Sequence, residues 1–485
     1  MPWSEGLAEL AARLDSRQLS AVELTEHCLD RIASHDGRIG AFLSTTDPDQ
    51  VLAAAAAADA ARAAGDHPSP LAGVPVAIKD NVAVEGEPLT CGSRLLAEYT
   101  PPYTATAVAR LQQAGMLVIG KTNMDEFGFG SSTENSAFQV TRNPRDAERV
   151  PGGTSGGSAA AVAAGLVPCA IGTDTGGSVR QPAALCGVVG MRPSYGRISR
   201  YGLVAYASSM DQIGPIGNSV ADASMLLGLM MGPDRCDSTC LPHDPPDLDP
   251  QLPRLTLGIP DEYQTDNCEP SVLAVLEDTI ERAKRAGWQV RPVSLPLTPY
   301  ALAAYYLAAS VEASSNLGRY DGVRYGYRSP DRSSWLEMLT TTRTEGFGDE
   351  AKRRIMLGTF ASSSGYYDEF YVRALRMRTL IAREFARAFE EVDLILSPVS
   401  PSTAWPLGQR TKDPLEMYLS DVFSVPVSLA GIPATVLPAG DDAAGLPVGL
   451  QIAGPALADD LVVAAARQLE ALIDYPRGQG FELAA

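Results

Sequence analysis

Residues 149–180 are RVPGGTSGGSAAAVAAGLVPCAIGTDTGGSVR, in which two glycine-flanked hydroxyl turns, GGTSGGS and TGGS, frame a stretch of small residues. No charge occurs between Arg149 and Asp174, as in a membrane span. However, glycines and Pro168 interrupt the stretch, and alanine outnumbers leucine and isoleucine. The composition therefore predicts a tightly packed helix over about 156–165 inside a soluble core.

The bulk composition is that of a folded protein with a large core. The chain has 485 residues, of which 45% are hydrophobic, with 44 Gly and 36 Pro. Its 39 Lys and Arg against 58 Asp and Glu give a net charge of -19. Such a charge repels phosphate backbones and anionic membranes. We therefore expect neither a broad nucleic-acid-binding face nor a membrane partner.

The order of elements predicts an α/β fold. Short apolar runs that end in turn residues alternate with helical stretches, and the runs are VPVAIKDNV, GMLVIGKT, CAIGTDT, LTLGIP, VDLILSP and PVGLQIAG. Ser20 and Glu23 form a capping box for an N-terminal helix, and a second, alanine-rich helix ends at Gly65. This alternation predicts a largely buried central sheet covered by helices on both faces.

We expect one large domain rather than several. N-terminal helices span about 5–65, a core spans about 70–225, and a C-terminal part over about 255–480 completes the sheet and the substrate pocket. The proline- and aspartate-rich segment 240–255 is interpreted as a long surface loop, because apolar strand signals resume directly after it.

Cysteines and the N-terminus indicate the compartment. Seven cysteines, an odd number without CxxC spacing, lie mostly in apolar or helical surroundings and are expected to be reduced core thiols. The first residues, MPWSEGLAEL, contain neither a basic stretch nor an apolar segment typical of a signal peptide. A cytoplasmic protein is expected.

The second glycine turn has the features of an anion-stabilising loop. In GTDTGGSVR, the backbone N–H groups of Thr175, Gly176 and Gly177 can approach a ligand closely and stabilise an oxyanion next to Ser178. The alternative is an ordinary glycine-rich loop that caps the next helix. A phosphate loop fits less well, because neither turn has the GK[ST] ending.

A serine nucleophile needs a base, and histidine is an unattractive choice. The four histidines, at positions 27, 35, 67 and 243, lie far in sequence from both glycine turns and from the ends of the apolar runs. Lys79 ends the apolar run VPVAI, where burial would favour the neutral amine that accepts a proton. The alternative is a solvated or ion-paired strand end beside Asp80.

The order of these elements resembles the amidase-signature hydrolases. The matching segments are PVAIKDN, GGTSGGSAAAVAAG, GTDTGGSVRQPAALCGVVGMRPSYGRIS, MDQIGPIGNSVADA, SLAGIPATVLPAG and LPVGLQIAG, so the resemblance covers nearly the whole chain. It implies the fold of that family, a single domain with a mixed central sheet and helices on both faces. It also implies a Ser-Ser-Lys triad that needs no metal and no organic cofactor in this chain.

By position, the resemblance assigns Ser178 as the nucleophile, Thr154 as the residue in place of the bridging serine, and Lys79 as the general base. In the family the bridging residue follows a cis peptide bond, which here would join Gly153 and Thr154. The β-branched threonine departs from the usual serine and adds a methyl group in a tight site. Ser155 is the alternative relay.

Within the family, the chain most resembles the glutamine-hydrolysing subunits of tRNA-dependent amidotransferases. Segments outside the shared signature carry this likeness, among them NMDEFGFGSSTENSAF, YYLAASVEASSNLGRYDGVRYGYRS and TEGFGDEAKRRIMLGTFASSSGYYDEFY. The likeness implies that Arg354 binds the α-carboxylate of glutamine and Asp421 its α-ammonium, with Tyr305, Gly130 and Ser131 lining the pocket. The alternative is that Arg354 and Asp421 are ordinary surface charges.

The implied activity is hydrolysis of glutamine to glutamate and ammonia. The ammonia would pass to a tRNA-binding kinase and transamidase subunit, which uses ATP and Mg²⁺ to amidate Glu-tRNA(Gln), Asp-tRNA(Asn) or both. A small bridging subunit would complete the complex, and tRNA contact would fall to the partner. Two alternatives stay open: a stand-alone amidase that acts on small amides, and a catalytically silent scaffold subunit.

Overall fold

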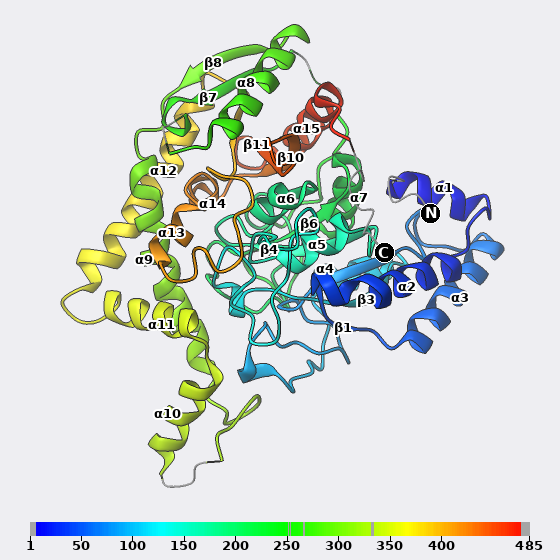
Figure 1. The fold of residues 1–485 in the computed structure, drawn as a ribbon, viewed down its shortest axis with the longest axis horizontal. Coiled ribbons are helices and arrows are strands. Elements are labelled where there is room, and N and C mark those ends of the chain that lie inside the picture. Colours follow the sequence, from blue (N-terminus) through cyan, green and yellow to red (C-terminus); the bar gives the residue numbers. More distant parts are fainter. Residues whose placement is uncertain (1–5, 251, 253, 265–266, 331–333, 477–485) are drawn as a thin grey trace.

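The centre of the molecule is a mixed sheet of 11 strands in the order β1-β3-β2-β4-β6-β5-β10-β11-β9-β7-β8 (Figure 1). The computed structural model describes residues 6–250, 252, 254–264, 267–330 and 334–476. The strands are β1 (Phe42–Thr45), β2 (Pro75–Lys79), β3 (Leu117–Thr122), β4 (Cys169–Asp174), β5 (Val189–Arg192), β6 (Gln212–Gly217), β7 (Thr256–Pro260), β8 (Gln289–Val293), β9 (Leu394–Pro398), β10 (Ala434–Asp441) and β11 (Pro447–Ala453).

Parallel and antiparallel pairs coexist in this sheet. Strand β2 pairs in parallel with β3 and β4, and β7 pairs in parallel with β8 and β9. The pairs β1–β3, β4–β6, β5–β6, β5–β10, β10–β11 and β9–β11 are antiparallel. Strands β2, β4, β6, β9 and β11 are buried along their whole length, as expected for a sheet covered on both faces. The predicted single α/β domain with a mixed sheet is confirmed.

Helices pack on both faces of the sheet, and α10 projects away from the body (Figure 1). Within the described residues the α-helices are α1 (Leu7–Asp15), α2 (Ala21–Ile39), α3 (Pro48–Ala64), α4 (Thr106–Gln113), α5 (Gly156–Ala163), α6 (Arg180–Cys186), α7 (Val220–Met230), α8 (Pro270–Arg285), α9 (Thr298–Asn316), α10 (Trp335–Gly346), α11 (Asp349–Ala361), α12 (Arg373–Ala388), α13 (Pro414–Leu419), α14 (Val425–Ala430) and α15 (Asp459–Ile473).

Local sequence signals explain several helix ends. The Ser20 side chain accepts a hydrogen bond from the Glu23 amide and the Glu23 carboxylate accepts one from the Ser20 amide, which completes the predicted capping box of α2. Helix α3 ends at Gly65 in the left-handed conformation. Helix α5 is buried on every side, as the small-residue composition predicts.

The cysteines only partly match the expectation of core thiols. Five of the seven free cysteines are buried, but Cys240 is half-buried and Cys236 is exposed. Cys236 precedes the segment 240–255 and Cys240 begins it, and the described residues of this segment form neither a helix nor a strand. Their local polar loop, rather than an apolar core, determines this exposure.

The topology brings the two glycine turns to one edge of the sheet. Ile78 of β2 is paired with Ile171 of β4, so Lys79 and Asp174 lie at the carboxyl ends of adjacent parallel strands. The TGGS turn follows β4 directly, and the GGTSGGS turn leads into α5, which packs against the same strands. Open α/β sheets bind ligands at this edge, outside the carboxyl ends of the strands.

Candidate active site

Lys79 ends β2 in a fully buried position among three hydroxyl groups. Its Nζ donates hydrogen bonds to Thr154 Oγ1 at 2.6 Å, Ser155 Oγ at 2.8 Å and Thr173 Oγ1 at 2.9 Å. The neighbouring Asp80 instead pairs with Lys121 at 3.0 Å. Lys79 is therefore neither solvated nor paired with Asp80, which removes the alternative interpretation of a strand-end charge.

Burial lowers the pKa of Lys79 from its ordinary value to about 7, and the charges of Asp125, Asp174 and Asp211 only partly oppose this shift. The charged ammonium is costly in a buried position, so the neutral amine gains in population. At neutral pH a substantial fraction of Lys79 can therefore accept a proton. A base with its pKa near the working pH is what general base catalysis requires.

Thr154 and Ser155 both reach Lys79, but their hydroxyls have different surroundings. Ser155 Oγ donates to the carbonyl of Thr173 at 3.1 Å and accepts from the Thr173 amide at 3.2 Å. These bonds fix the Ser155 hydroxyl against the backbone of β4. Within the described part of the chain, the Thr154 hydroxyl bonds only to Lys79, so it has capacity left for a further partner. The peptide bond between Gly153 and Thr154 is cis.

Ser178 lies at the end of the TGGS turn and is partly exposed, whereas Gly177 and Val179 beside it are buried. Its carbonyl accepts a hydrogen bond from the Ser155 amide at 3.1 Å, which ties the two glycine turns together. None of the described residues bonds to its hydroxyl. The nucleophile proposed from the sequence thus faces the accessible side of the site.

A buried carboxylate holds this turn in shape. Asp174 accepts hydrogen bonds from Arg180 Nε at 3.0 Å and from Arg192 Nη1 at 2.8 Å, and all three side chains are fully buried. Burial alone would raise the pKa of Asp174, but the two guanidinium groups outweigh it and hold the pKa well below the usual range. Asp174 is therefore a permanent anion that anchors the turn.

The same carboxylate changes the prediction for the oxyanion donors. The amide of Gly177 donates to Asp174 Oδ1 at 3.1 Å, so this N–H is directed into the protein. No hydrogen bond within the described residues involves the amides of Thr175 and Gly176. In this structure the available donors of the predicted set are therefore Thr175 and Gly176, and not Gly177.

Arg354 and Asp421 are both buried, with exposed fractions of 2% and 8%, which argues against ordinary surface charges. Arg354 on α11 donates to Glu350 Oε1 at 2.6 Å and to the Tyr206 hydroxyl at 2.9 Å. Its guanidinium carbon lies 4.3 Å from the ring centre of Tyr306. No hydrogen bond within the described residues uses Nη2, so this nitrogen is free for a carboxylate ligand.

Asp421 lies between α13 and α14, close to Arg354. Its Oδ2 accepts hydrogen bonds from Ser131 Oγ at 2.6 Å and from the Tyr306 hydroxyl at 3.3 Å. Burial raises the pKa of Asp421 to about 7, although Ser131, Arg354 and Tyr306 pull it down. An ammonium ligand would favour the ionised carboxylate and lower that pKa.

The other predicted lining residues are found around this pair. The Tyr305 hydroxyl lies against the TGGS turn, because a Cβ atom at Gly176 would come within 2.6 Å of it. Ser131 contacts Asp421 directly. Gly130 has φ of +150°, and a Cβ there would lie 2.5 Å from the Asp125 carboxylate. Glycine at this position therefore lets the backbone lie directly against the Asp125 side chain.

Several residues of the site were not found from the sequence. Thr173 contacts Lys79, while Tyr206 and Tyr306 contact Arg354, and all three are buried. Thr173 stands in the quoted GTDTGGS segment, two residues after Ile171 on β4, so its proximity to Lys79 followed from the parallel pairing of β2 with β4. The tyrosines gave no comparable signal, because Tyr306 reaches Arg354 through the packing of α9, and Tyr206 reaches it from the loop before β6, which is distant in sequence.

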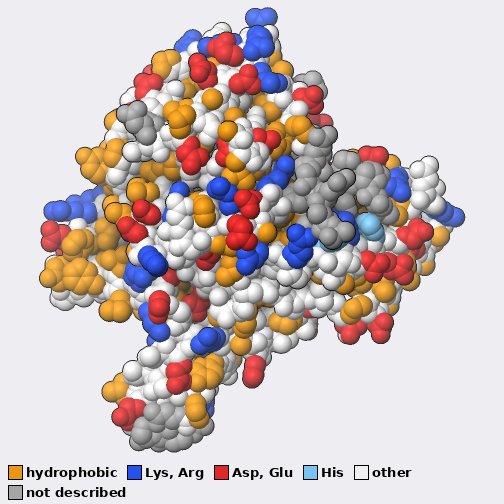
Figure 2. Space-filling view, viewed as in Figure 1, with side chains coloured by type: hydrophobic (Ala, Val, Ile, Leu, Met, Phe, Trp, Pro, Cys, Tyr) orange, Lys and Arg blue, Asp and Glu red, His pale blue; other side chains and the backbone are white. Residues whose placement is uncertain are grey.

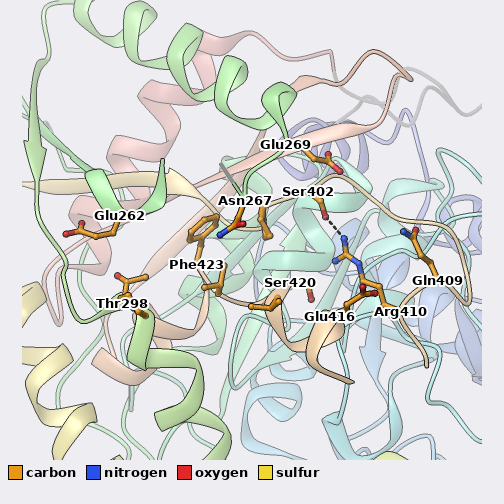
Figure 3. A pocket seen from close by; sticks show the side chains of 14 residues that line it. Glu262, Asn267, Glu269, Thr298, Ser402, Gln409, Arg410, Glu416, Ser420 and Phe423 are labelled. Carbon is orange, nitrogen blue, oxygen red and sulfur yellow. Dashed lines mark hydrogen bonds between the residues drawn. The ribbon is translucent and has the colours of Figure 1, made fainter. Parts of the chain in front are cut away.

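A separate cavity of about 590 Å³ is lined by residues that flank Asp421 in the sequence, but not by Asp421 itself (Figure 3). Ser420 and Phe423 line it, and Arg410 reaches into it while donating to Ser402 Oγ at 3.1 Å. None of the residues that line this cavity belongs to the lysine and serine cluster. It is therefore distinct from the candidate active site.

The buried lysine, the hydroxyl cluster and the sheet edge define an α/β enzyme site, and comparisons with known proteins identify the class. The family model described as amidase matches residues 23–463. A relative from Moorella thermoacetica, named as a glutamyl-tRNA(Gln) amidotransferase subunit, is 52% identical over 473 residues, covering 97% of this chain and 96% of the relative. The chain belongs to the amidase family, and it is an amide hydrolase.

Solved structures agree with this assignment. The crystal structure of a glutamyl-tRNA(Gln) amidotransferase subunit from Thermotoga maritima matches with a TM-score of 0.76 at 39% identity, covering 94% of each chain. Peptide amidase from Stenotrophomonas maltophilia matches with a TM-score of 0.80 at 29% identity, covering 98% of each chain. Among the helices that the structure describes, none has both the length and the apolar character needed to cross a membrane.

Proposed function

We propose that this protein is the glutaminase subunit of a tRNA-dependent amidotransferase. The observation that carries the proposal is the buried pair of Arg354 and Asp421 beside the serine turn. A guanidinium and a carboxylate in one pocket match the two charges of a free amino acid, whereas a lipid or aryl amide has neither charge to offer them. The relatives named as amidotransferase subunits support the amidotransferase role.

In the proposed reaction, neutral Lys79 accepts a proton from the Thr154 hydroxyl, which takes one from Ser178. Ser178 Oγ then forms a bond to the side-chain carbonyl carbon of glutamine, and the resulting oxyanion is stabilised by the amides of Thr175 and Gly176. The relayed proton returns to the amide nitrogen, and the C–N bond breaks to release ammonia. Water then attacks the acyl-enzyme, giving glutamate and restoring the Ser178 hydroxyl.

The hydrogen bonds around Lys79 support this direction of proton transfer. A neutral amine has two N–H groups and one lone pair. Ser155 can only accept from Lys79, because its own proton is directed to the Thr173 carbonyl. When Lys79 is neutral and Ser155 and Thr173 accept its two N–H groups, the 2.6 Å contact reverses, and the Thr154 hydroxyl donates to the lone pair of Lys79. Thr154 then serves as the relay.

The ammonia would be used by a partner subunit that binds misacylated tRNA and consumes ATP with Mg²⁺. A small bridging subunit would complete the complex, and the amidated product would be Gln-tRNA(Gln), Asn-tRNA(Asn) or both. The net charge of -19 is consistent with a chain that leaves most tRNA contact to its partner. The proposed complex works in the cytoplasm, where tRNA is charged.

The test compares substrates for the chain alone and for the chain assembled with the two other subunits from its own organism. Release of glutamate and ammonia from glutamine is measured beside hydrolysis of acetamide and of a peptide amide. We expect glutamine to be preferred, and its hydrolysis to be coupled to tRNA amidation in the complex. Preference for the simple amides would instead favour a stand-alone amidase, which the likeness to peptide amidase supports.

A further inference from the structure

The first turn of α11 places a carboxylate beside the Arg354 guanidinium. Glu350 and Arg354 are four residues apart, so their side chains lie on one face of the helix. Arg354 Nε donates to Glu350 Oε1 at 2.6 Å, and the two side chains are 3% and 10% exposed, respectively. The guanidinium that is proposed to bind the substrate carboxylate is therefore already paired within its own helix.

Burial distinguishes this ion pair from its neighbour on the same helix. Lys352 and Asp349 are 3.9 Å apart, and their side chains are 37% and 95% exposed. Figure 2 shows acidic and basic side chains intermixed on the visible surface where Figure 1 labels α11. Water and salt screen such exposed charges. The charge of Glu350 is screened much less, so it acts on whatever Arg354 binds.

The Glu350 carboxylate is held from other directions as well. The Tyr418 hydroxyl donates to the same Oε1 at 2.8 Å, and Arg353 pairs with Oε2. The ring centre of Tyr418 also lies 4.6 Å from the guanidinium carbon of Arg354. Rotating the carboxylate away would break all of these contacts. Glu350 therefore fixes the direction in which the guanidinium points.

This pairing determines which edge of the guanidinium is open to a ligand. A guanidinium can bind a carboxylate through Nε and one terminal nitrogen, or through both terminal nitrogens. Glu350 occupies Nε, and the Tyr206 hydroxyl accepts one bond from Nη1 at 2.9 Å. Nη2 makes no hydrogen bond within the part of the chain that the structure describes. A substrate carboxylate therefore binds at the end of the guanidinium, where Nη2 lies.

The same pairing sets the balance of charge around the substrate. Arg354 contributes one positive charge and Glu350 one negative charge, and Asp421 adds a second negative charge when it is ionised. Arg353 also contacts Glu350, but its side chain is 48% exposed and its charge is screened. An anion without an ammonium group would meet two carboxylates and one buried guanidinium. A zwitterion would satisfy both Arg354 and Asp421.

We infer that Glu350 makes this site select a zwitterionic amide over a simple anionic amide. The inference rests on the proposed function, in which Arg354 and Asp421 bind the two charges of glutamine. Glu350 does not touch the substrate. It positions Arg354 and balances the guanidinium charge, so that the carboxylate of a substrate is bound strongly only when an ammonium group accompanies it.

The test compares three amides on the full chain, assembled with the subunits of the proposed complex. Glutamine carries both charges, glutarate monoamide lacks the α-ammonium, and γ-aminobutyramide lacks the α-carboxylate. Glu350→Gln keeps the shape and an acceptor for Nε but removes the charge. We expect the preference for glutamine over glutarate monoamide, measured as a ratio of kcat/KM, to fall at least about fivefold. The preference over γ-aminobutyramide should rise, because the cation loses an attracting carboxylate.

Two further variants separate charge from position. Asp349→Asn is the matched control, because it removes the same charge from an exposed side chain one residue away, and it should change both ratios by less than about twofold. Glu350→Asp keeps the charge but is one methylene shorter, so it should raise the KM for glutamine and preserve the ranking of the three amides. If Glu350→Gln does not fold, as judged by circular dichroism, a changed ranking in Glu350→Asp would overturn the inference.

The outcomes distinguish this inference from the function on which it rests. If wild type prefers glutamine to both analogues and Glu350→Gln slows all three amides equally, Glu350 is only structural, and the proposed function stands. Opposite changes with the two analogues support the role of Glu350 in selection. If wild type hydrolyses glutarate monoamide as well as glutamine, both the inference and the proposed substrate are overturned.

Discussion

Nζ of Lys79 and Oγ1 of Thr154 lie 2.6 Å apart in a position where both side chains are excluded from solvent. Such a short hydrogen bond between a buried amine and a buried hydroxyl lets a proton pass directly from one group to the other. Because burial lowers the pKa of Lys79 to about 7, the amine can act as donor or acceptor near neutral pH.

Lys79→Met should abolish glutamine hydrolysis and leave the protein folded. Methionine fills about the same buried volume but supplies no base, so the loss should be about 10²-fold or greater. The measurement is kcat for glutamine, with circular dichroism as the control for folding. Arginine is a poorer replacement here, because its larger head group would have to fit among three hydroxyls. A folded Lys79→Met protein that keeps a tenth of the wild-type rate would remove Lys79 from the mechanism.

Arg354→Ala and Asp421→Asn should each raise the KM for glutamine strongly. Each substitution leaves one charge of the zwitterion without its buried partner, which costs roughly 2–4 kcal/mol in a desolvated pocket. Steady-state kinetics with glutamine give the KM values, and a neutral substrate such as acetamide serves as the control. Unchanged glutamine kinetics in both variants would mean that the substrate assignment is wrong, although amide hydrolysis itself could persist.

The acid side of the pH profile should reflect two groups. The pKa of Lys79 is lowered to about 7 and that of Asp421 is raised to about 7, and both must lose a proton before glutamine is bound and attacked. As pH falls below 7 both become protonated, so log kcat/KM should fall with a slope of about two. In Asp421→Asn the slope should fall to about one, because only Lys79 still titrates. An equal slope in both proteins would show that Asp421 does not govern this limb.

Asp174→Asn should destabilise the fold, because it leaves Arg180 and Arg192 buried without their anion. Removing one partner of a buried ion pair costs about 3–5 kcal/mol in the free energy of unfolding. The Asp174 pKa is lowered in the folded state, so its stabilisation is present above the unfolded pKa of about 3.9 and is lost as pH falls further. Urea unfolding at pH 7 and at pH 3.5 tests this: the gap between wild type and variant should narrow at the lower pH. A constant gap would contradict it.

Much of the fold could be predicted from the sequence, because local patterns carried the information. The capping box at Ser20 and the stop at Gly65 determine helix ends by short-range hydrogen bonds and backbone freedom, and both are found as predicted. Strands such as β5 (Val189–Arg192) and β10 were missed: β5 is short and pairs with β6 and with the distant β10, and β10, which forms a hairpin with β11, is interrupted by Pro438. A short or proline-interrupted segment gives no periodic signal for such pairing.

In the candidate site, too, features encoded by neighbouring residues could be predicted, and features that depend on distant residues could not. The motif around Ser178 placed the glycine turn correctly at a strand end, since strand and turn are contiguous in sequence. It could not show that the Gly177 amide turns inward to Asp174, because that bond depends on two arginines that fix the carboxylate from α6 and β5. Likewise Tyr306 contacts both Arg354 and Asp421 through the packing of α9, which no local pattern encodes.

The last prediction concerns Thr154, which the sequence resemblance places at the position of a bridging serine. Thr154→Val keeps the β-branch and the volume but removes the hydroxyl, so it should reduce kcat by about 10²-fold or more if residue 154 relays the proton. Thr154→Ser keeps the donor and acceptor and should stay active. If residue 154 only fills space, valine should be tolerated better than serine, because it matches threonine in shape.

Ser155→Ala is the control that separates relay from support. The Ser155 hydroxyl donates to the Thr173 carbonyl and accepts from the Thr173 amide. Its loss should therefore lower stability and, through that, activity, while Thr154 still relays the proton. Glutamine kcat is measured for all three variants with the partner subunits present, alongside the free energy of unfolding. Loss of activity in Thr154→Val at unchanged stability, with Thr154→Ser active, supports the relay. An active Thr154→Val protein together with an inactive, fully stable Ser155→Ala protein would transfer the relay to Ser155.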